Sequence, residues 1–368
     1  MRSTYCEIDL KNIEHNLNEI KKLSGGVKIV AIVKANAYGH GMVESAKTLS
    51  KAGVDFLGVA FPDEAKVLRK NGIKDKIMTI VTCSPEEAAD VLEYDIHPVV
   101  SRKEMLKVYD SEAKKRGKTA KLHLFVNTGM NRDGIRCEEV TDFLEEASKY
   151  ENIKIEGILT HFASSEFEDT SFADEQLKKF NAVLIMLEHN NIEMDYIHTA
   201  NSAAVLNVRG SHFNMVRPGI SLYGYMSTRK LTEQTTLKPV MKLKSKVLNT
   251  RRIQKGETAG YSMKYIADKD MNIAVVPMGY GDGYTTLLTN KGECLINGKK
   301  YSLIGSVCMD QLMVDLDDEN AEPGDEVVFL GKQGENEISI HDLSERSGLI
   351  PYEIFTLILD RVKRVYIH

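Results

Sequence analysis

The chain has 368 residues, of which 42% are hydrophobic and 27% charged, and its formal net charge is −5. Without a basic surplus, nucleic acid is not an expected partner, and no apolar run reaches the roughly 18 residues that a membrane span needs. The five cysteines are scattered and form no C-x-x-C pair, which indicates a reducing compartment and no metal site. We therefore expect a cytoplasmic protein of two domains.

From residue 11 to about 225, short apolar runs alternate with stretches of helical spacing. This alternation predicts a parallel sheet, and eight units in one domain predict a closed (β/α)8 TIM-type barrel over residues 11–237, in an α/β fold. An open doubly wound sheet is the alternative. The eight runs are Val27–Val33, Phe56–Val59, Ile77–Val81, Ile96–Val100, Leu122–Val126, Ile153–Leu159, Met194–His198 and Phe213–Val216.

After about Leu237 the pattern changes to short runs separated by turn signals such as Asn297-Gly298 and Pro323-Gly324. This predicts a mainly β domain over residues 238–368. Residues 1–10 contain another alternating segment and are expected to join its sheet. The runs expected to form strands include Val247-Leu248, Ile273–Val276, Cys294–Ile296, Leu312–Val314 and Val327–Leu330.

Lys34 stands where the first apolar run ends and a glycine-punctuated loop begins. A lysine at such a strand exit is partly desolvated, and desolvation or a nearby cation lowers its pKa from the reference value of about 10.4. More of the amine is then free to form a Schiff base. The alternative is a strand-end lysine that extends to solvent.

Polar residues also follow the later runs, and barrel enzymes carry their active sites where strands end. Arg132 lies in the glycine-rich loop after the fifth run, and His161 follows the sixth. Each of these two residues, taken alone, is as easily structural as catalytic. Ser202 begins a helix after the seventh run, and Gly219 follows the eighth, which is where barrels often bind phosphate. An amine on the first strand opposite a phosphate site is what pyridoxal phosphate requires.

The segment Val33–Gly41 resembles the pyridoxal-phosphate attachment signature of alanine racemases. The similarity covers nearly the whole chain, in the same order. It continues through Asn127–Gly134, Thr160–Ala163, His198–Ala203, Val216–Gly219, Gly260–Ser262, Pro277–Tyr284 and Val307–Gln311.

The resemblance implies a pyridoxal-phosphate-dependent racemase that interconverts L- and D-alanine to supply peptidoglycan precursors. Lys34 would hold the cofactor and act as the base on one face of the substrate. Tyr261 would be the base on the other face, contributed by the second subunit of a homodimer with shared active sites.

The family also implies binding residues. Arg217 would meet the pyridine nitrogen and His161 would pack on the ring. The remaining expected cofactor contacts are Tyr38, Asn201, Ser202, Gly219, Ile220 and Tyr352. The expected substrate contacts are Arg132, Tyr280, Met309 and Asp310.

Some positions depart from the family pattern. Phe125 stands where a carbamylated lysine often braces the arginine, so we expect Asn127 or a bound anion to hold Arg132. Glu166 and Thr286 stand at the gate to the active site, and Ser306 replaces a common arginine. These changes leave a serine or dual alanine/serine racemase as an alternative.

Tyr352 favours alanine, because it resembles the tyrosine that lines the methyl pocket. Two further alternatives share the barrel. A non-catalytic pyridoxal-phosphate carrier would lack the β domain. A basic amino-acid decarboxylase would have a carboxylate where this chain has Arg217.

Overall fold

The computed structural model describes residues 3–368, which divide into two compact units. One consists of residues 13–37 and 42–237, and the other of residues 3–12, 38–41 and 238–368. None of the helices within residues 3–368 combines the length and apolarity needed to cross a bilayer.

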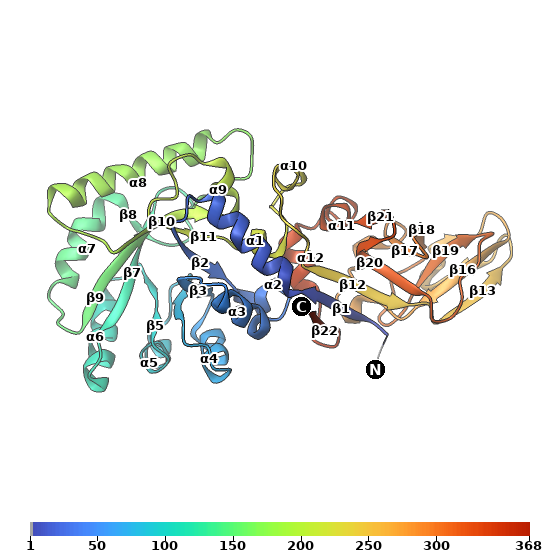
Figure 1. The fold of residues 1–368 in the computed structure, drawn as a ribbon, viewed down its shortest axis with the longest axis horizontal. Coiled ribbons are helices and arrows are strands. Elements are labelled where there is room, and N and C mark those ends of the chain that lie inside the picture. The colour runs from blue at the N-terminus through green and yellow to red at the C-terminus, as the bar shows by residue number, and fades with distance from the viewer. Residues whose placement is uncertain (1–2) are drawn as a thin grey trace. The chain divides into compact units, whose positions relative to one another are not determined.

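The first unit is a parallel β-barrel, as the sequence predicted (Figure 1). Its strands follow one another in the order β5-β4-β3-β2-β11-β10-β9-β7-β6, and a short strand β8 adds to β7. They are β2 (Lys28–Ile32), β3 (Phe56–Val59), β4 (Lys76–Thr79), β5 (Ile96–His97), β6 (Val99–Val100), β7 (Ala120–Asn127), β8 (Ile135–Arg136), β9 (Ile153–Leu159), β10 (Tyr196–Asn201) and β11 (Met215–Arg217).

The barrel closes through residues 96–100, a single extended stretch that Pro98 divides into β5 and β6. β5 pairs with β4 and β6 pairs with β7, both in parallel. Proline has no N–H to donate to a ladder. Its carbonyl still accepts a hydrogen bond of 3.0 Å from the backbone N–H of His123, so this stretch counts as one barrel strand and the eight-strand count holds.

Helices connect successive strands and lie outside them (Figure 1). The longer helices bury an apolar stripe, as α7 does with Val140, Phe143 and Ala147. The helices are α1 (Leu10–Leu23), α3 (Met42–Lys51), α4 (Pro62–Lys70), α5 (Ala88–Glu93), α6 (Glu104–Arg116), α7 (Val140–Ala147), α8 (Ser171–His189), α9 (Ser202–Asn207) and α10 (Arg229–Glu233).

The second unit is mainly β, with strand order β13-β16-β19-β18-β17-β20-β12-β1-β22. Its pairs are antiparallel except for β1 with β22. The elements are β1 (Tyr5–Asp9), β12 (Met241–Lys246), β13 (Asn249–Ile253), β14 (Thr258–Ala259), β15 (Tyr265–Ile266), β16 (Met271–Val276), β17 (Glu293–Ile296), β18 (Lys299–Ile304), β19 (Leu312–Asp317), β20 (Glu326–Gln333), β21 (Asn336–Ile338), α11 (Ile340–Ser347), α12 (Pro351–Leu357) and β22 (Lys363–Ile367).

Two sequence signals in this unit had different outcomes. Asn297-Gly298 forms the two-residue turn between β17 and β18, with both residues at positive φ, as such hairpins require. The expected strand at Val247-Leu248 is wrong, because these residues connect β12 to β13. β12 pairs with β20 and β13 pairs with β16, so the chain changes its pairing partner at Val247-Leu248. Leu248 is exposed.

Candidate active site

Lys34 begins one turn of left-handed helix that follows β2 (α2, Lys34–Tyr38). The four residues Ala35, Asn36, Ala37 and Tyr38 all have φ between 48° and 55°. For residues other than glycine this conformation costs roughly 1–2 kcal/mol each. Strain of this kind persists where surrounding contacts impose it, and it concentrates at functional sites.

Three hydrogen bonds hold this left-handed turn. The N–H of Ala35 donates to Glu64 Oε1 at 2.7 Å, and the N–H of Ala37 donates to the carbonyl of Val33 at 2.8 Å. The Asn36 side chain accepts from the N–H of Met42 at 2.8 Å. The backbone that follows Lys34 is therefore held by hydrogen bonds both at its start and at its end.

The Lys34 amine is half-buried, and its surroundings favour the neutral form. Burial lowers the pKa of Lys34, and the nearby positive charge of Arg132 lowers it further, while Glu64 acts in the opposite direction. A lysine with a lowered pKa has more free amine at neutral pH, which is what nucleophilic chemistry requires.

The loop that carries Arg132 is held by two of its own side chains. Asn127 Oδ1 accepts from the N–H groups of Gly129 and Asn131 at 3.0 and 3.1 Å. Asp133 accepts hydrogen bonds of 2.6 Å from the hydroxyls of Thr82 and Ser101. Asn127 thus shapes the loop.

Arg132 itself is exposed, and within residues 3–368 its guanidinium has no hydrogen-bond or ion-pair partner. Phe125, where the resemblance led us to look for a brace for Arg132, packs in a small apolar cluster with Val99 and Leu159. Among the described residues Asn127 does not contact the Arg132 guanidinium, and a bound anion as its brace stays a prediction.

Arg217 is buried at the end of β11, and its donors are almost all used. Nη1 donates to Nδ1 and to the carbonyl of His198 at 2.9 and 2.8 Å. Nη2 donates to the carbonyls of Thr160 and Thr199 at 2.8 and 2.9 Å and approaches His161 Nδ1 at 3.1 Å. Of the five N–H groups of a guanidinium, the one on Nε has no partner among the described residues.

His161 is kept neutral by its position. Burial lowers the pKa of His161 to about 3, with further lowering by Arg217, Arg132 and Lys34. Because Arg217 can only donate, His161 Nδ1 is the acceptor and its Nε2 carries the hydrogen.

Ser202 collects hydrogen bonds from the loop that follows β11. Its hydroxyl oxygen accepts from the N–H of Gly219 at 2.8 Å, and the N–H and hydroxyl of Ser221 donate to it at 3.4 and 3.0 Å. The hydrogen of the Ser202 hydroxyl has no acceptor within residues 3–368. Asn201, one residue earlier, caps α9 by accepting from the N–H of Ala204 at 3.0 Å. Ile220 begins a short 3₁₀ turn, Ile220–Tyr223, directly after Gly219.

In the second unit, Tyr38 and Tyr352 lie edge to face, with ring centroids 5.9 Å apart. Tyr38 is buried, and this burial raises the pKa of its hydroxyl. Tyr38 therefore stays protonated at neutral pH, so it can donate a hydrogen bond.

Tyr261 sits in a short 3₁₀ turn, Tyr261–Met263, and is 74% exposed. Its carbonyl accepts a hydrogen bond of 2.9 Å from the Ser306 hydroxyl, so Ser306 supports the turn that presents Tyr261. Tyr261 lies with Tyr280, Met309 and Asp310 around a surface hollow of about 960 Å³.

The loop containing Met309 and Asp310 is clamped to the loop containing Tyr280. A side chain at Gly279 would come within 2.2 Å of the Cys308 carbonyl, so only glycine permits this approach. Arg361 links the two loops, donating at 2.6 Å both to the buried carboxylate of Asp282 and to Asp310.

The expected residues thus fall into two groups. Lys34, Arg132, His161, Asn201, Ser202, Arg217, Gly219 and Ile220 lie in the barrel unit, and Tyr38, Tyr261, Tyr280, Met309, Asp310 and Tyr352 lie in the other. Sequence reasoning gave no role to the Asp282–Arg361 clamp or to His198. A signal existed for His198, because it is a polar residue inside an apolar run.

Comparisons with known proteins identify the family of this chain. The model of the alanine racemase N-terminal domain matches residues 8–227, and that of the alanine racemase C-terminal domain matches residues 240–366. An alanine racemase of Carboxydothermus hydrogenoformans is 41% identical over 369 residues, covering 100% of both chains.

Among solved structures, the alanine racemase of Clostridium difficile has a TM-score of 0.94 at 35% identity and covers 99% of this chain and 96% of its own. The alanine racemase of Bacillus anthracis with bound L-Ala-P has a TM-score of 0.93 at 36% identity, covering 100% and 96%. With both domains matched and full-length relatives at this identity, the chain belongs to the alanine racemase family.

Proposed function

We propose that this chain is a pyridoxal-phosphate-dependent isomerase that interconverts L- and D-alanine, with Lys34 and Tyr261 as its two bases. The observation that carries the proposal is the fixed guanidinium of Arg217, which retains one unpartnered N–H in the same unit as a lysine of lowered pKa. The names of its relatives support alanine as the substrate.

The residues present fit pyridoxal phosphate. A guanidinium N–H needs an acceptor, and an unprotonated pyridine nitrogen is one, whereas a protonated pyridine is not. The free hydrogen of the Ser202 hydroxyl and the adjoining backbone of Gly219 and Ile220 suit a phosphate group. Tyr38, which stays protonated, would donate to the same phosphate, and Asn201 and Tyr352 complete the expected contacts.

When bound, the cofactor would withdraw electrons from the substrate Cα and so weaken its C–H bond. Lys34 would hold the cofactor and accept the Cα proton at Nζ on one face of the substrate. Tyr261 would supply a proton from its hydroxyl to the other face, which inverts the centre. Arg132, with Tyr280, Met309 and Asp310, would hold the substrate carboxylate.

Arg217 would limit side reactions. As a donor-only group it would favour an unprotonated pyridine nitrogen, which makes the bound cofactor a weaker electron sink. We infer that a weaker electron sink favours rapid return of the proton to Cα over its transfer elsewhere, which would produce pyruvate by transamination.

We infer a homodimer in which each Tyr261 serves the partner's active site. Tyr261 and its neighbours Met263, Tyr280 and Met309 expose large apolar side chains in one unit. Exposed apolar patches of this kind mark protein interaction surfaces. We also place the protein in the cytoplasm, where its five free cysteines would stay reduced.

A serine racemase is the second candidate, and the names of the relatives do not favour it. The test is an assay of purified protein, with added pyridoxal phosphate, on L-alanine, D-alanine and L-serine. We expect alanine to racemise in both directions and serine to react at least about tenfold more slowly, since one misplaced group in a pocket is worth about 1–3 kcal/mol.

Borohydride reduction followed by peptide mapping assigns the attachment site. The pyridoxyl group should be found on Lys34 and be absent from Lys34→Ala, while Lys47→Ala, a surface lysine variant, should label normally. Label on a different lysine, or faster turnover of serine than of alanine, would contradict the proposal.

A further inference from the structure

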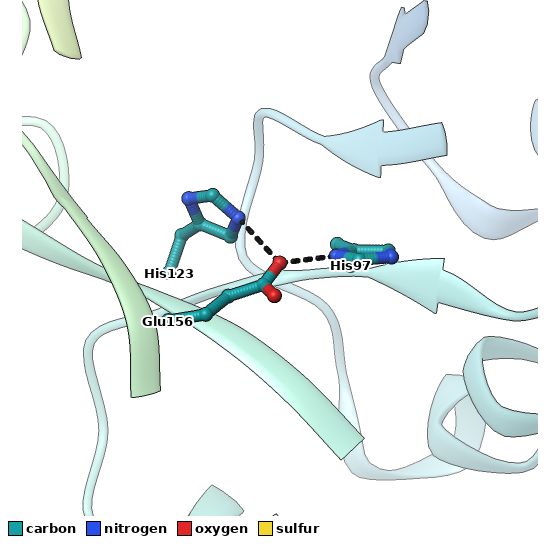
Figure 2. Close-up of side chains that lie close together, drawn as sticks. All are labelled: His97, His123 and Glu156. Carbon is teal, nitrogen blue, oxygen red and sulfur yellow. Dashed lines mark hydrogen bonds and ion pairs between the residues drawn. The ribbon is translucent and has the colours of Figure 1, made fainter. Parts of the chain in front are cut away.

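A row of buried polar side chains crosses the barrel interior from Glu156 to Arg217. Figure 2 shows His97 and His123 on either side of the Glu156 carboxylate, from which His123 Nε2 lies 3.2 Å away. His123 Nδ1 lies 3.0 Å from His198 Nε2, and His198 Nδ1 lies 2.9 Å from Arg217 Nη1. All five residues are at most 6% exposed, so these contacts are shielded from water.

The guanidinium fixes the direction of every hydrogen bond in this row. Arg217 can only donate, so His198 Nδ1 must accept and His198 Nε2 must carry the hydrogen. His198 Nε2 then donates to His123 Nδ1, which leaves the hydrogen of His123 on Nε2. That hydrogen is donated to Glu156, whose oxygen ends the row as an acceptor.

The charge states agree with this direction. Burial lowers the pKa of both His123 and His198, which keeps the two imidazoles neutral. Burial raises the pKa of Glu156, but the hydrogen bonds from His123 and His97 outweigh it and hold the pKa below its ordinary value. The row therefore has one cation and one anion at its ends and two neutral rings between them.

The same direction argues against a metal ion at His97, His123 and Glu156, although their ligand atoms lie within 4.8 Å of one another. A metal would take the lone pair of His123 Nε2 and move its hydrogen to Nδ1. His198 would then have to accept at Nε2 and carry its hydrogen on Nδ1, facing another donor on Arg217.

The His123 ring has little freedom to adopt another arrangement. It stacks on Tyr196 with centroids 5.5 Å apart and an interplanar angle of 22°. On the β9 side it occupies the space left by Gly157, where a Cβ would come within 2.2 Å of His123 Nδ1. A fixed ring can transmit a tautomer preference from one neighbour to the next.

We propose that Glu156 and His123 are positioning residues for racemisation: by accepting the last hydrogen bond of the row, Glu156 keeps both imidazoles in the tautomer that lets His198 hold Arg217. This inference rests on the proposed function, in which Arg217 faces the pyridine nitrogen. Neither residue would touch substrate or cofactor, and both would act through the aim of the Arg217 guanidinium.

The test compares Glu156→Leu, which removes the acceptor, with Glu156→Gln, which retains an oxygen able to accept. Phe180→Leu, a buried substitution in α8, serves as a control for general destabilisation. The first readout is the tautomer of His123 and His198 in the holoenzyme, from long-range ¹⁵N–¹H correlations of ¹⁵N-histidine-labelled protein. The signals are assigned with His123→Gln and His198→Gln variants.

In the wild type and in Glu156→Gln we expect both rings to carry hydrogen on Nε2 at neutral pH. In Glu156→Leu we expect mixed tautomers and a fall of about tenfold or more in the ratio of racemised alanine to pyruvate, the scale on which lost supporting hydrogen bonds act. Glu156→Gln should keep this ratio within about threefold of the wild type. Phe180→Leu should lower stability and change neither tautomers nor ratio.

The proposal is overturned if Glu156→Leu keeps both tautomers and the product ratio, or if His123 of the wild type carries its hydrogen on Nδ1. Should Glu156→Leu fail to fold, His123→Leu removes the same link and is judged by the His198 tautomer and the ratio. A wild type without racemisation would instead refute the proposed function, and the tautomer readout, which needs no turnover, separates the two failures.

Discussion

At the scale of single residues, the burial of Arg217 is possible because its guanidinium donates hydrogen bonds to several buried acceptors. Backbone carbonyls of Thr160, His198 and Thr199 accept from it directly, and the His198 and His123 rings connect it by hydrogen bonds to the Glu156 carboxylate. Removing one member of a buried hydrogen-bond network leaves its partner unsatisfied, which costs about 1–3 kcal/mol. Glu156 should therefore matter to stability as well as to the aim of Arg217.

Glu156→Gln should make the stability of this protein less dependent on pH. The folded pKa of Glu156 lies below its unfolded value, so the stabilisation is complete above an unfolded pKa of about 4.3 and is lost as pH falls through the folded pKa. We expect the wild type to exceed Glu156→Gln by about 1–3 kcal/mol in free energy of unfolding at pH 7.

Urea unfolding of both proteins at pH 7, 5 and 3.5 measures this difference. The difference in free energy of unfolding between wild type and Glu156→Gln should be equal at pH 7 and 5 and smaller at pH 3.5. The exposed Glu175→Gln serves as a control and should show little difference at any of these pH values. A difference between wild type and Glu156→Gln that grows on acidification would contradict the assigned ionisation.

At the scale of elements, the left-handed turn after Lys34 stores strain beside the proposed attachment site. The turn ends the first barrel strand and redirects the chain within five residues, and hydrogen bonds that the Glu64 and Asn36 side chains accept from backbone N–H groups hold it in this form. Such strain costs stability and fixes the backbone from which Lys34 extends.

Ala35→Gly should leave stability unchanged or raise it by up to about 1 kcal/mol, because glycine adopts positive φ without the steric cost that alanine bears. Ala35 is exposed, so no packing is lost. The matched control is Ala182→Gly in the right-handed helix α8, also exposed, which should cost about 1 kcal/mol. Urea unfolding measures both changes, and equal losses at the two positions would show that the turn at Ala35 is not strained.

At the scale of the whole molecule, the proposed bases are a strand-end lysine and an exposed tyrosine in separate units. A proton donor that works on a buried substrate cannot remain in contact with bulk water. The 74% exposure of Tyr261 therefore calls for a covering surface, which a second copy of the chain would supply.

Tyr261→Phe and Lys34→Ala subunits, each inactive alone, should regain activity when mixed. In a hybrid dimer one of the two sites has both bases intact, so random exchange should restore about a quarter of wild-type activity, given two-fold symmetry. Native mass spectrometry verifies the exchange. A mixture of Lys34→Ala with Lys34→Arg, which leaves no site intact, is the control. Demonstrated hybrids without recovered racemisation would place both bases in one chain.

The barrel could be predicted from the sequence because parallel strands buried on both faces require continuous apolar runs, and eight such runs are countable. The runs also located the strand ends, and therefore Lys34, Ser202 and Arg217. Strand limits were less accurate, since the seventh strand runs from Tyr196 to Asn201 whereas the apolar run ends at His198. Hydrogen bonding, which hydrophobicity does not report, sets those limits.

The sequence by itself determined the family and the order of the elements, because both depend on local patterns and on motifs that are contiguous in the chain. Only the tertiary structure decided how His97, His123, Glu156 and His198 combine. Each is a polar residue inside an apolar run on a different strand, and their partners are set by strand order around the barrel. The donor-only chemistry of Arg217 gives that row its direction, and it acts only because folding brings residues 156 and 217 to the two ends of one chain of hydrogen bonds.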